Sequence, residues 1–316
     1  MSCQPVCDCN FTMSNTGTDC RPLIQVVKKP IFTPTYDSTG ARNFIDLTDT
    51  VDAALFTGLI NEADASKRIF PLPDVIDVDD KRADPTVQNL SDGRKIFIKD
   101  GTRTFVGMIW GKDGNTVLKS KIDAARCGDV SVYLVDRLGN LIGIVSDDKT
   151  KLYPIRLDAN SISAQYINAT DTTTQGIRLS FDFDPSESDG CIGMITAAEL
   201  TDAQPLLFRG LLDVTALYTT PVAAGLTFTP KTDYGTPMNP VLVKGLLAAD
   251  MAFYNVTTSS AIAITGTGAA FSESNGVYTI LYATADQPVA TNVIRLTVTK
   301  AGYDWSGVLA ATFVTG

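Results

Sequence analysis

The stretch KIFIKDGTRTFVGMIW, residues 95–110, decides the fold class. It has runs rich in β-branched and aromatic residues on either side of Asp100-Gly101. Asp-Gly is a strong signal for a tight hairpin turn, because glycine accepts a positive φ without strain. The stretch therefore predicts a long β-hairpin that turns at Asp100-Gly101.

An alternation with a period of two continues for about 75 residues downstream. SVYLVDRLGNLIGIV, residues 131–145, predicts a second hairpin at Gly139-Asn140. Helices are expected near 49–64, capped by Thr48 or Asp49, and near 116–127. We expect a loop in PLPDVIDVDDKRADP, residues 71–85, because close prolines and many Asp residues oppose regular structure. Residues 23–202 thus predict an antiparallel β-barrel or β-sandwich domain with two flanking helices.

The composition changes in the last third of the chain. From 203 onward Thr, Ala, Val and Gly dominate, and strand-like segments recur at the spacing of a β-sandwich. We expect an immunoglobulin-like β-sandwich over 203–316, without the intersheet disulfide because the last cysteine is Cys191. The predicted fold class is therefore mainly β, with a minor α+β character.

Composition and charge narrow the classes of function. The 316 residues include 35 acids and 26 bases, a formal charge of −9, and no histidine. An acidic chain without a basic cluster has no electrostatic footprint for gripping phosphates. The lack of histidine excludes Ser-His-Asp and Cys-His catalysis and two-His zinc sites. We expect a protein that is not an enzyme and that needs no cofactor.

Four cysteines, Cys3, Cys7, Cys9 and Cys20, lie in an N-terminal arm at 1–22. Four thiolates suit zinc, but their spacing is not that of two Cys-x2-Cys knuckles, and disulfides are unusual in a reducing cytosol. We favour packing of these small thiols against a neighbouring chain and keep zinc or a disulfide as the weaker alternative. The polar first residues lead us to expect no export signal, and no apolar run approaches the ~20 residues of a membrane span.

An acidic run in the expected loop is a second candidate for a metal site. Carboxylate oxygens of this kind bind hard cations such as calcium. A solvated acidic loop is the interpretation we favour. The run consists of Asp74, Asp77, Asp79, Asp80 and Asp84.

The order of several segments resembles structural proteins of tailed bacteriophages that infect Bacteroidetes, the crAss-like group. These segments are the Cys-rich start, KKPIFTPTYDSTGARNFIDLTD (28–49), NEADASKRIFPLP (61–73), DGTRTFVGMIWGKD (100–113), ARCGDVSVYLVDRLGNLIGIV (125–145) and LYPIRLDANSISAQYINATDTTTQGIRLSFDFD (152–184). The resemblance covers roughly residues 1–200. It implies a virion protein made in the host bacterial cytoplasm, with a fold like that of tail-tube and tail-ring proteins.

These points together predict a non-enzymatic subunit of a closed homo-oligomeric ring in the tail or neck. DNA would pass through the ring without specific binding, since an acidic lining does not hold phosphates. Neighbouring tail or portal proteins would be the other partners. The expected interface residues, all in the long hairpin, are Lys95, Phe97, Arg103, Phe105 and Trp110.

Three alternative functions remain open from the sequence. A capsid decoration or head-fibre protein would display the C-terminal sandwich outward. A carbohydrate-binding adhesive module would need exposed aromatic side chains on one sheet face, and the only tryptophans are Trp110 and Trp305. A carboxylate-dependent glycan hydrolase would need a buried Asp/Glu pair in a cleft.

Overall fold

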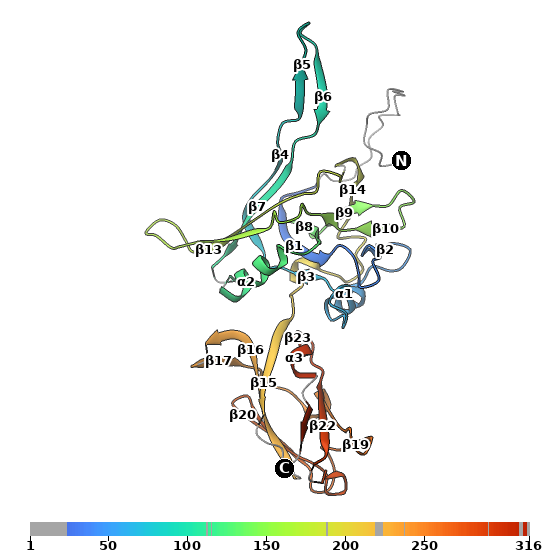
Figure 1. Cartoon of the computed structure of the whole chain (residues 1–316), viewed down its shortest axis with the longest axis vertical. Coiled ribbons are helices and arrows are strands. Elements are labelled where there is room, and N and C mark those ends of the chain that lie inside the picture. Colours follow the sequence, from blue (N-terminus) through green and yellow to red (C-terminus); the bar gives the residue numbers. More distant parts are fainter. Residues whose placement is uncertain are drawn as a thin grey trace. The chain divides into compact units, whose positions relative to one another are not determined.

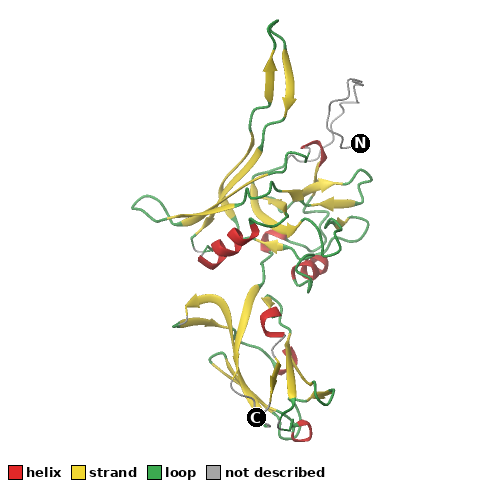
Figure 2. Cartoon of the chain, viewed as in Figure 1, coloured by secondary structure: helices red, strands yellow, loops and turns green. Residues whose placement is uncertain are grey.

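The chain divides into two compact units at Gly210, and each unit has a core of its own. The computed structural model describes residues 24–111, 113–114, 116–187, 189–218, 224–236, 238–289, 291–309 and 312–314. Figure 1 labels the elements of both units, and Figure 2 shows that strands outnumber helices in each. The fold is mainly β, with antiparallel sheets, as the alternation predicts.

The unit boundary falls eight residues after the position expected from composition, because the intervening segment packs on the first unit. The Phe208 ring lies 4.7 Å from that of Phe56, centroid to centroid. The carbonyl oxygen of Phe208 also accepts a hydrogen bond of 3.0 Å from Nζ of Lys29, a side chain with no exposed surface. Composition alone does not reveal these contacts.

The first unit consists mainly of short strands. Its elements are β1 (Val27–Pro34), β2 (Ile45–Asp46), α1 (Ala53–Ile60), β3 (Phe70–Pro71), β4 (Val75–Arg82), β5 (Thr86–Asn89), β6 (Lys95–Lys99), β7 (Arg103–Trp110), α2 (Thr116–Ala125), β8 (Val130–Asp136), β9 (Leu141–Val145), β10 (Lys151–Tyr153), β11 (Ile155–Arg156), β12 (Ser163–Ile167), β13 (Gly176–Asp182), η1 (Asp189–Cys191), β14 (Ile192–Ile195) and η2 (Pro205–Leu207).

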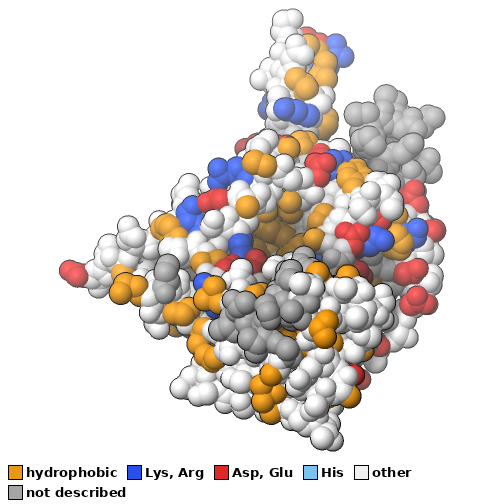
Figure 3. All heavy atoms as spheres, turned by 60° about the horizontal axis from the view of Figure 1, so that its bottom comes forward, with side chains coloured by type: hydrophobic (Ala, Val, Ile, Leu, Met, Phe, Trp, Pro, Cys, Tyr) orange, Lys and Arg blue, Asp and Glu red, His pale blue; other side chains and the backbone are white. Residues whose placement is uncertain are grey.

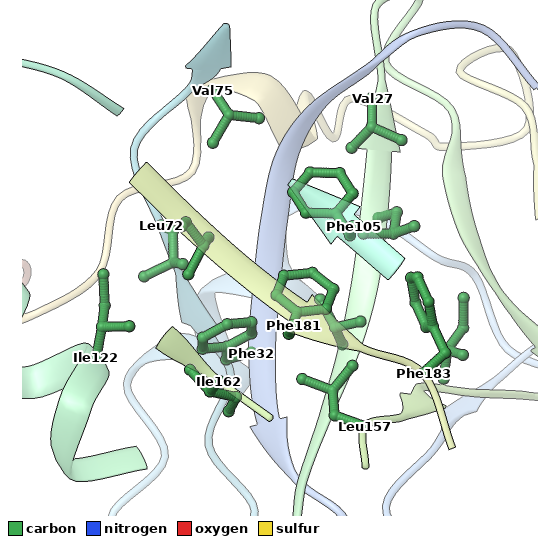
Figure 4. Close-up of a cluster of buried hydrophobic side chains, with 14 of the residues drawn as sticks. Val27, Phe32, Leu72, Val75, Phe105, Ile122, Leu157, Ile162, Phe181 and Phe183 are labelled. Carbon is green, nitrogen blue, oxygen red and sulfur yellow. The ribbon is translucent and has the colours of Figure 1, made fainter. Parts of the chain in front are cut away.

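Two sheets of the first unit enclose its core. One has the order β2-β10-β9-β8-β1-β3, with β11 on β8 and β14 on β9, and the other has the order β12-β13-β7-β4. The β8–β9 hairpin turns at Gly139, whose φ is +86°, as the sequence predicts. Between the sheets Phe181 stacks on Phe105 at 4.8 Å and meets Phe32 edge-on at 5.8 Å (Figure 4). Strands β1, β7 and β13, far apart in sequence, are held together by these rings.

Helix α1 is shorter than the pattern predicts. Asp52 caps it by accepting a hydrogen bond of 2.8 Å from the Leu55 amide, so neither Thr48 nor Asp49 is the cap. The buried side chains of α1 are Phe56 and Ile60. Helix α2 begins at Thr116 as expected and ends at Ala125.

Two predictions around residues 71–110 are wrong. The acidic segment contains strand β4, which pairs with β7 from Val75↔Ile109 to Arg82↔Arg103. Its bulge includes Asp77, whose φ is +50°. Asp100-Gly101 is not a turn either: β6 pairs with β5, so the chain runs on from β6 into β7.

The second unit is a β-sandwich with immunoglobulin-like strand order. Taking β15, β16, β18, β20, β21, β22 and β24 as strands A to G, one sheet reads A-B-E-D and the other C-F-G. Its elements are β15 (Leu212–Tyr218), β16 (Gly225–Thr236), β17 (Asn239–Leu242), η3 (Ala248–Asp250), β18 (Met251–Asn255), β19 (Ser260–Ile262), β20 (Ala270–Ser274), β21 (Val277–Leu281), η4 (Thr284–Asp286), β22 (Val293–Val298), β23 (Tyr303–Asp304), α3 (Ser306–Leu309) and β24 (Thr312–Val314).

A buried tyrosine ties a loop to the core of this sandwich. The Tyr278 hydroxyl donates to the Val243 carbonyl oxygen at 3.1 Å and accepts from the Leu246 amide at 3.0 Å. A second buried tyrosine, Tyr282, lies 5.5 Å from Phe253, and its hydroxyl has no partner among the described residues. The two tyrosines therefore differ in what their hydroxyl groups contribute.

Candidate functional site: the projecting arm

Residues 86–99 form a two-stranded arm that projects from the first unit, at the top of Figure 1. Strand β5 pairs with β6 from Thr86↔Lys99 to Asn89↔Lys95. At the tip the Gly93 amide donates to the Leu90 carbonyl oxygen at 3.0 Å, and Gly93 has a φ of +84°. A three-residue hairpin loop with glycine in the left-handed region is a favoured solution for such a turn. The structure therefore places the turn at Asp92-Gly93 and not at Asp100-Gly101.

Every residue in the two strands of the arm is exposed. The exposed fraction is 40% for Val87, 48% for Ile96, 48% for Phe97 and 55% for Ile98. A two-stranded hairpin in water is marginally stable, and a contiguous exposed apolar surface marks a site of interaction. The apolar side chains of the arm contribute nothing to the cores of the two units, so contact with another molecule accounts for them best.

The arm differs in charge from the rest of the chain. Residues 86–99 carry three bases and one acid, a net charge of +2. Because the whole chain has a formal charge of −9, the remaining residues carry −11. Arg94 pairs with Asp92 at 2.6 Å, whereas Lys95 and Lys99 have no ion pair within the described residues. Figure 3 shows basic and hydrophobic side chains along the arm. An acidic surface would therefore attract it.

Two arginines, Arg82 and Arg103, lie at the ends of β4 and β7 from which the arm extends, a region that we call the root. Arg103 makes two hydrogen bonds to Asp80, of 2.8 and 2.6 Å, and its guanidinium carbon lies 4.4 Å from the centre of the Phe183 ring. Arg82 makes two hydrogen bonds of 2.8 Å to Asp189. Paired contacts of this kind restrict orientation as well as adding energy. The root therefore orders the ends of the two strands from which the arm extends.

The ion pair of Arg82 and Asp189 also changes proton affinities. Its hydrogen bonds hold the pKa of the Asp189 carboxyl below its ordinary value and raise the pKa of Arg82. Arg82 reaches across the root as well, donating to the Gly101 carbonyl oxygen at 2.7 Å. Both groups are therefore charged at neutral pH.

The structure places the five expected interface residues in different environments. Lys95 and Phe97 lie on the exposed arm, and Arg103 lies in the half-buried root. Phe105 has no exposed surface and belongs to the core, so it is not available for contact in this structure. Trp110, at the far end of β7, is 44% exposed, and its Nε1 donates to Oγ1 of Thr174 at 3.3 Å. Only two of the five thus lie on the arm.

Val87, Ile96 and Ile98 were missed by the sequence reasoning. The available signal was the run Ile96-Phe97-Ile98 between two lysines, three apolar residues without alternation. A strand with one solvated face alternates, whereas a continuous apolar run indicates burial on both faces. The run therefore stands out as unusual for a hairpin in water.

A cavity of about 230 Å³ in the first unit has two acids, Asp37 and Glu62, in its lining, and because neither is fully buried it gives little support to the hydrolase alternative. The Thr39 hydroxyl donates to Asp37 at 2.6 Å, which lowers the pKa of that lining carboxyl. The Tyr133 hydroxyl, also in the lining, donates to the Leu152 carbonyl oxygen at 3.0 Å, and burial raises its pKa. Asp37 is therefore ionised and Tyr133 protonated at neutral pH, so neither is a general acid poised near neutrality.

The acidic run does not form a cluster. Asp74 pairs with Lys29, Asp79 with Lys81 and Asp80 with Arg103. Within the described ranges no three His, Cys, Asp or Glu side chains gather as a metal site requires. The zinc candidates Cys3, Cys7, Cys9 and Cys20 lie outside the described residues.

Comparison of the chain with protein-family models, curated proteins and solved structures finds no match. No helix in the described part of the chain has both the length and the apolar character needed to cross a membrane. The function must therefore be argued from the arm itself.

Proposed function

We propose that the chain is a non-enzymatic structural subunit of a tailed-phage virion that assembles with identical copies into a closed ring of the tail or neck. The observation that carries the proposal is the arm, with four exposed apolar side chains outside either core. A ring forms when one patch meets a different patch on the next copy, and a projecting arm is such a patch. The order of segments that resembles crAss-like phage structural proteins supplies the virion context.

The charge balance supports the passage of DNA through this ring. At −9 overall, the chain offers phosphates repulsion rather than a binding surface. Tail or portal proteins of the virion would then contact the ring above and below. Localisation in the virion follows from the same proposal.

The symmetry of the purified assembly distinguishes the capsid decoration alternative from the ring. The carbohydrate-binding alternative has less support, because Trp305 in the second unit is buried. The strongly exposed aromatic side chains among the described residues all belong to the first unit: Tyr36, Phe44, Phe70, Phe97, Trp110 and Tyr166. No sheet face of the described sandwich therefore presents the aromatic platform that such a module uses.

The test is the mass and symmetry of the purified full-length protein, measured by light scattering and electron microscopy. We expect closed rings, and we expect that deleting residues 86–99 in favour of a short glycine linker yields monomers. Leu138→Glu, at a position 57% exposed in the β8–β9 turn, serves as the control that leaves rings intact. A wild-type monomer across the micromolar range would overturn the proposal, and a trimeric spike would favour the head-fibre alternative.

A further inference from the structure

The register of the arm assigns its apolar side chains to two faces. Val87 is paired with Phe97, and Gln88 with Ile96. Paired residues share a face of the ribbon, and neighbours along a strand point to opposite faces. Val87 and Phe97 therefore form one face, which we call the Phe97 face. Ile96, paired with Gln88, lies on the opposite one, the Ile96 face, whereas Ile98 is the unpaired residue of a bulge and is not assigned to a face by the register.

Both faces are exposed to a similar degree. On the Phe97 face the exposed fractions are 40% for Val87 and 48% for Phe97, and on the Ile96 face the exposed fraction of Ile96 is 48%. A hairpin that lies on a single surface needs only one apolar face and keeps the other polar. The arm carries an exposed apolar side chain on each of its two faces, so it fits between two surfaces rather than on one.

We infer that in the assembled state the arm is inserted between two further copies of this chain, with the Phe97 face on one copy and the Ile96 face on the other. This inference rests on the proposed function and adds the identity and number of the partners. Charge identifies the partner: the arm is +2, and the rest of each copy is −11. Lys95, on the Phe97 face, and Lys99 have no ion pair within the described chain, so the acidic surface of another copy is complementary to them.

Each arm thus joins three chains, and this makes assembly cooperative. Two copies alone bury only one face of an arm and leave the other in water. The second face is covered only when a third copy arrives. Dimers are therefore weak, and larger assemblies are strongly favoured over them.

The test introduces one negative charge on each face. Phe97→Asp and Ile96→Asp disrupt the two apolar faces, while Asn89→Asp and Gln88→Glu place the same charge at polar positions of the Phe97 and Ile96 faces. All four positions are fully within the exposed arm, so folding, checked by circular dichroism and thermal melting, remains that of the wild type. We expect each disruptive change to raise the concentration for half-assembly at least tenfold, and each control to change it less than threefold.

The outcomes separate this inference from the proposed function. If only one of the two disruptive variants impairs assembly, the arm docks on one surface, so the inference fails while the ring proposal stands. If neither does, both fail, because the arm is then not the interface.

A second readout comes from a photo-crosslinking amino acid placed at position 96 or at position 97 of the otherwise wild-type protein. The assembled protein is irradiated and the crosslinked peptides are identified by mass spectrometry. We expect crosslinked peptides from two different regions of the chain for the two positions. Crosslinks from both positions to one region would contradict insertion between two copies.

Discussion

Ala83 and Gly101 lie so close across the root of the arm that a Cβ at position 101 would stand 2.0 Å from the Ala83 carbonyl oxygen. The Ala83 amide donates to the Thr102 carbonyl oxygen at 2.9 Å, which keeps the two segments together. Glycine at 101 is therefore required by close backbone approach and not by a turn.

Gly101→Ala should force the two segments of the root apart. We expect a loss of about 1–3 kcal/mol in the free energy of unfolding, in the range of other substitutions that impose backbone strain or overpacking. Chemical denaturation measures it. Gly58→Ala is the matched control: no atom lies within 4 Å of its added Cβ, and alanine favours the α1 helix by up to ~1 kcal/mol. Equal effects of the two changes would contradict the close approach.

Tyr278→Phe and Tyr282→Phe remove the same atom from two buried sites. Tyr278 loses hydrogen bonds to Val243 and Leu246, and its partners are left buried, so we expect a loss of about 1–3 kcal/mol. Tyr282→Phe removes a buried hydroxyl without a described partner and should be neutral or stabilising. Thermal unfolding of both variants measures which one loses more stability. A larger loss for Tyr282→Phe than for Tyr278→Phe would contradict the prediction.

Asp74→Ala should destabilise the protein more than Lys29→Met. The first change leaves the buried ammonium of Lys29 without the carboxylate that lies 3.0 Å from it, whereas the second replaces the ammonium by an apolar group of similar volume. Because Asp74 is about half exposed, we expect a difference of about 1–2 kcal/mol. Urea denaturation measures both, and a larger loss for Lys29→Met would show that the bond to Phe208 dominates.

The buried Lys29 also predicts a dependence on pH. Desolvation lowers its pKa in the folded state, so the unfolded chain holds this proton to higher pH than the folded one. Stability should therefore rise as the pH increases through the folded-state pKa towards the ordinary value of 10.5. Lys29→Met should remove that rise, and the difference between the two pH profiles of the free energy of unfolding is the measurement.

The root should loosen in acid. Hydrogen bonds from Arg82 hold the pKa of Asp189 below its ordinary 3.8, so this pair stabilises the fold above that pH and the contribution is lost as the pH falls through the folded value. Since the Asp189 side chain is 53% exposed, we expect about 1 kcal/mol or less. The measurement is the protection factor of the Ala83 amide against hydrogen exchange, compared between pH 5 and pH 3. Asp189→Asn should abolish the difference between the two protection factors.

The strand-forming residues and the Gly139-Asn140 turn were enough to predict the mainly β fold and this hairpin, although both faces of β8 and β9 are buried. The same reasoning failed at β4, where Asp77, Asp79 and Lys81 are exposed on a paired strand. Charged side chains that form ion pairs across strands, or that are solvated, are compatible with a strand. Strand propensity by itself does not take these interactions into account.

The arm shows a different limit. Both Asp92-Gly93 and Asp100-Gly101 are suitable turns by local chemistry, and only the approach of Ala83 to Gly101 decides between them. That close approach is a tertiary contact, so the local sequence does not reveal it. The expected interface likewise included both the buried Phe105 of β7 and the exposed Phe97 of β6. A period of two in the sequence does not distinguish a strand of the core from an exposed strand.

Arg94, Lys95 and Lys99 make the arm the natural target of a trypsin-like protease while a copy is free, because each lies in exposed backbone with few contacts. In the proposed assembly, partners that cover both faces would shield the same bonds. The time that a newly made chain spends alone would then determine its chance of being cut, so that incorporation itself protects the molecule from degradation.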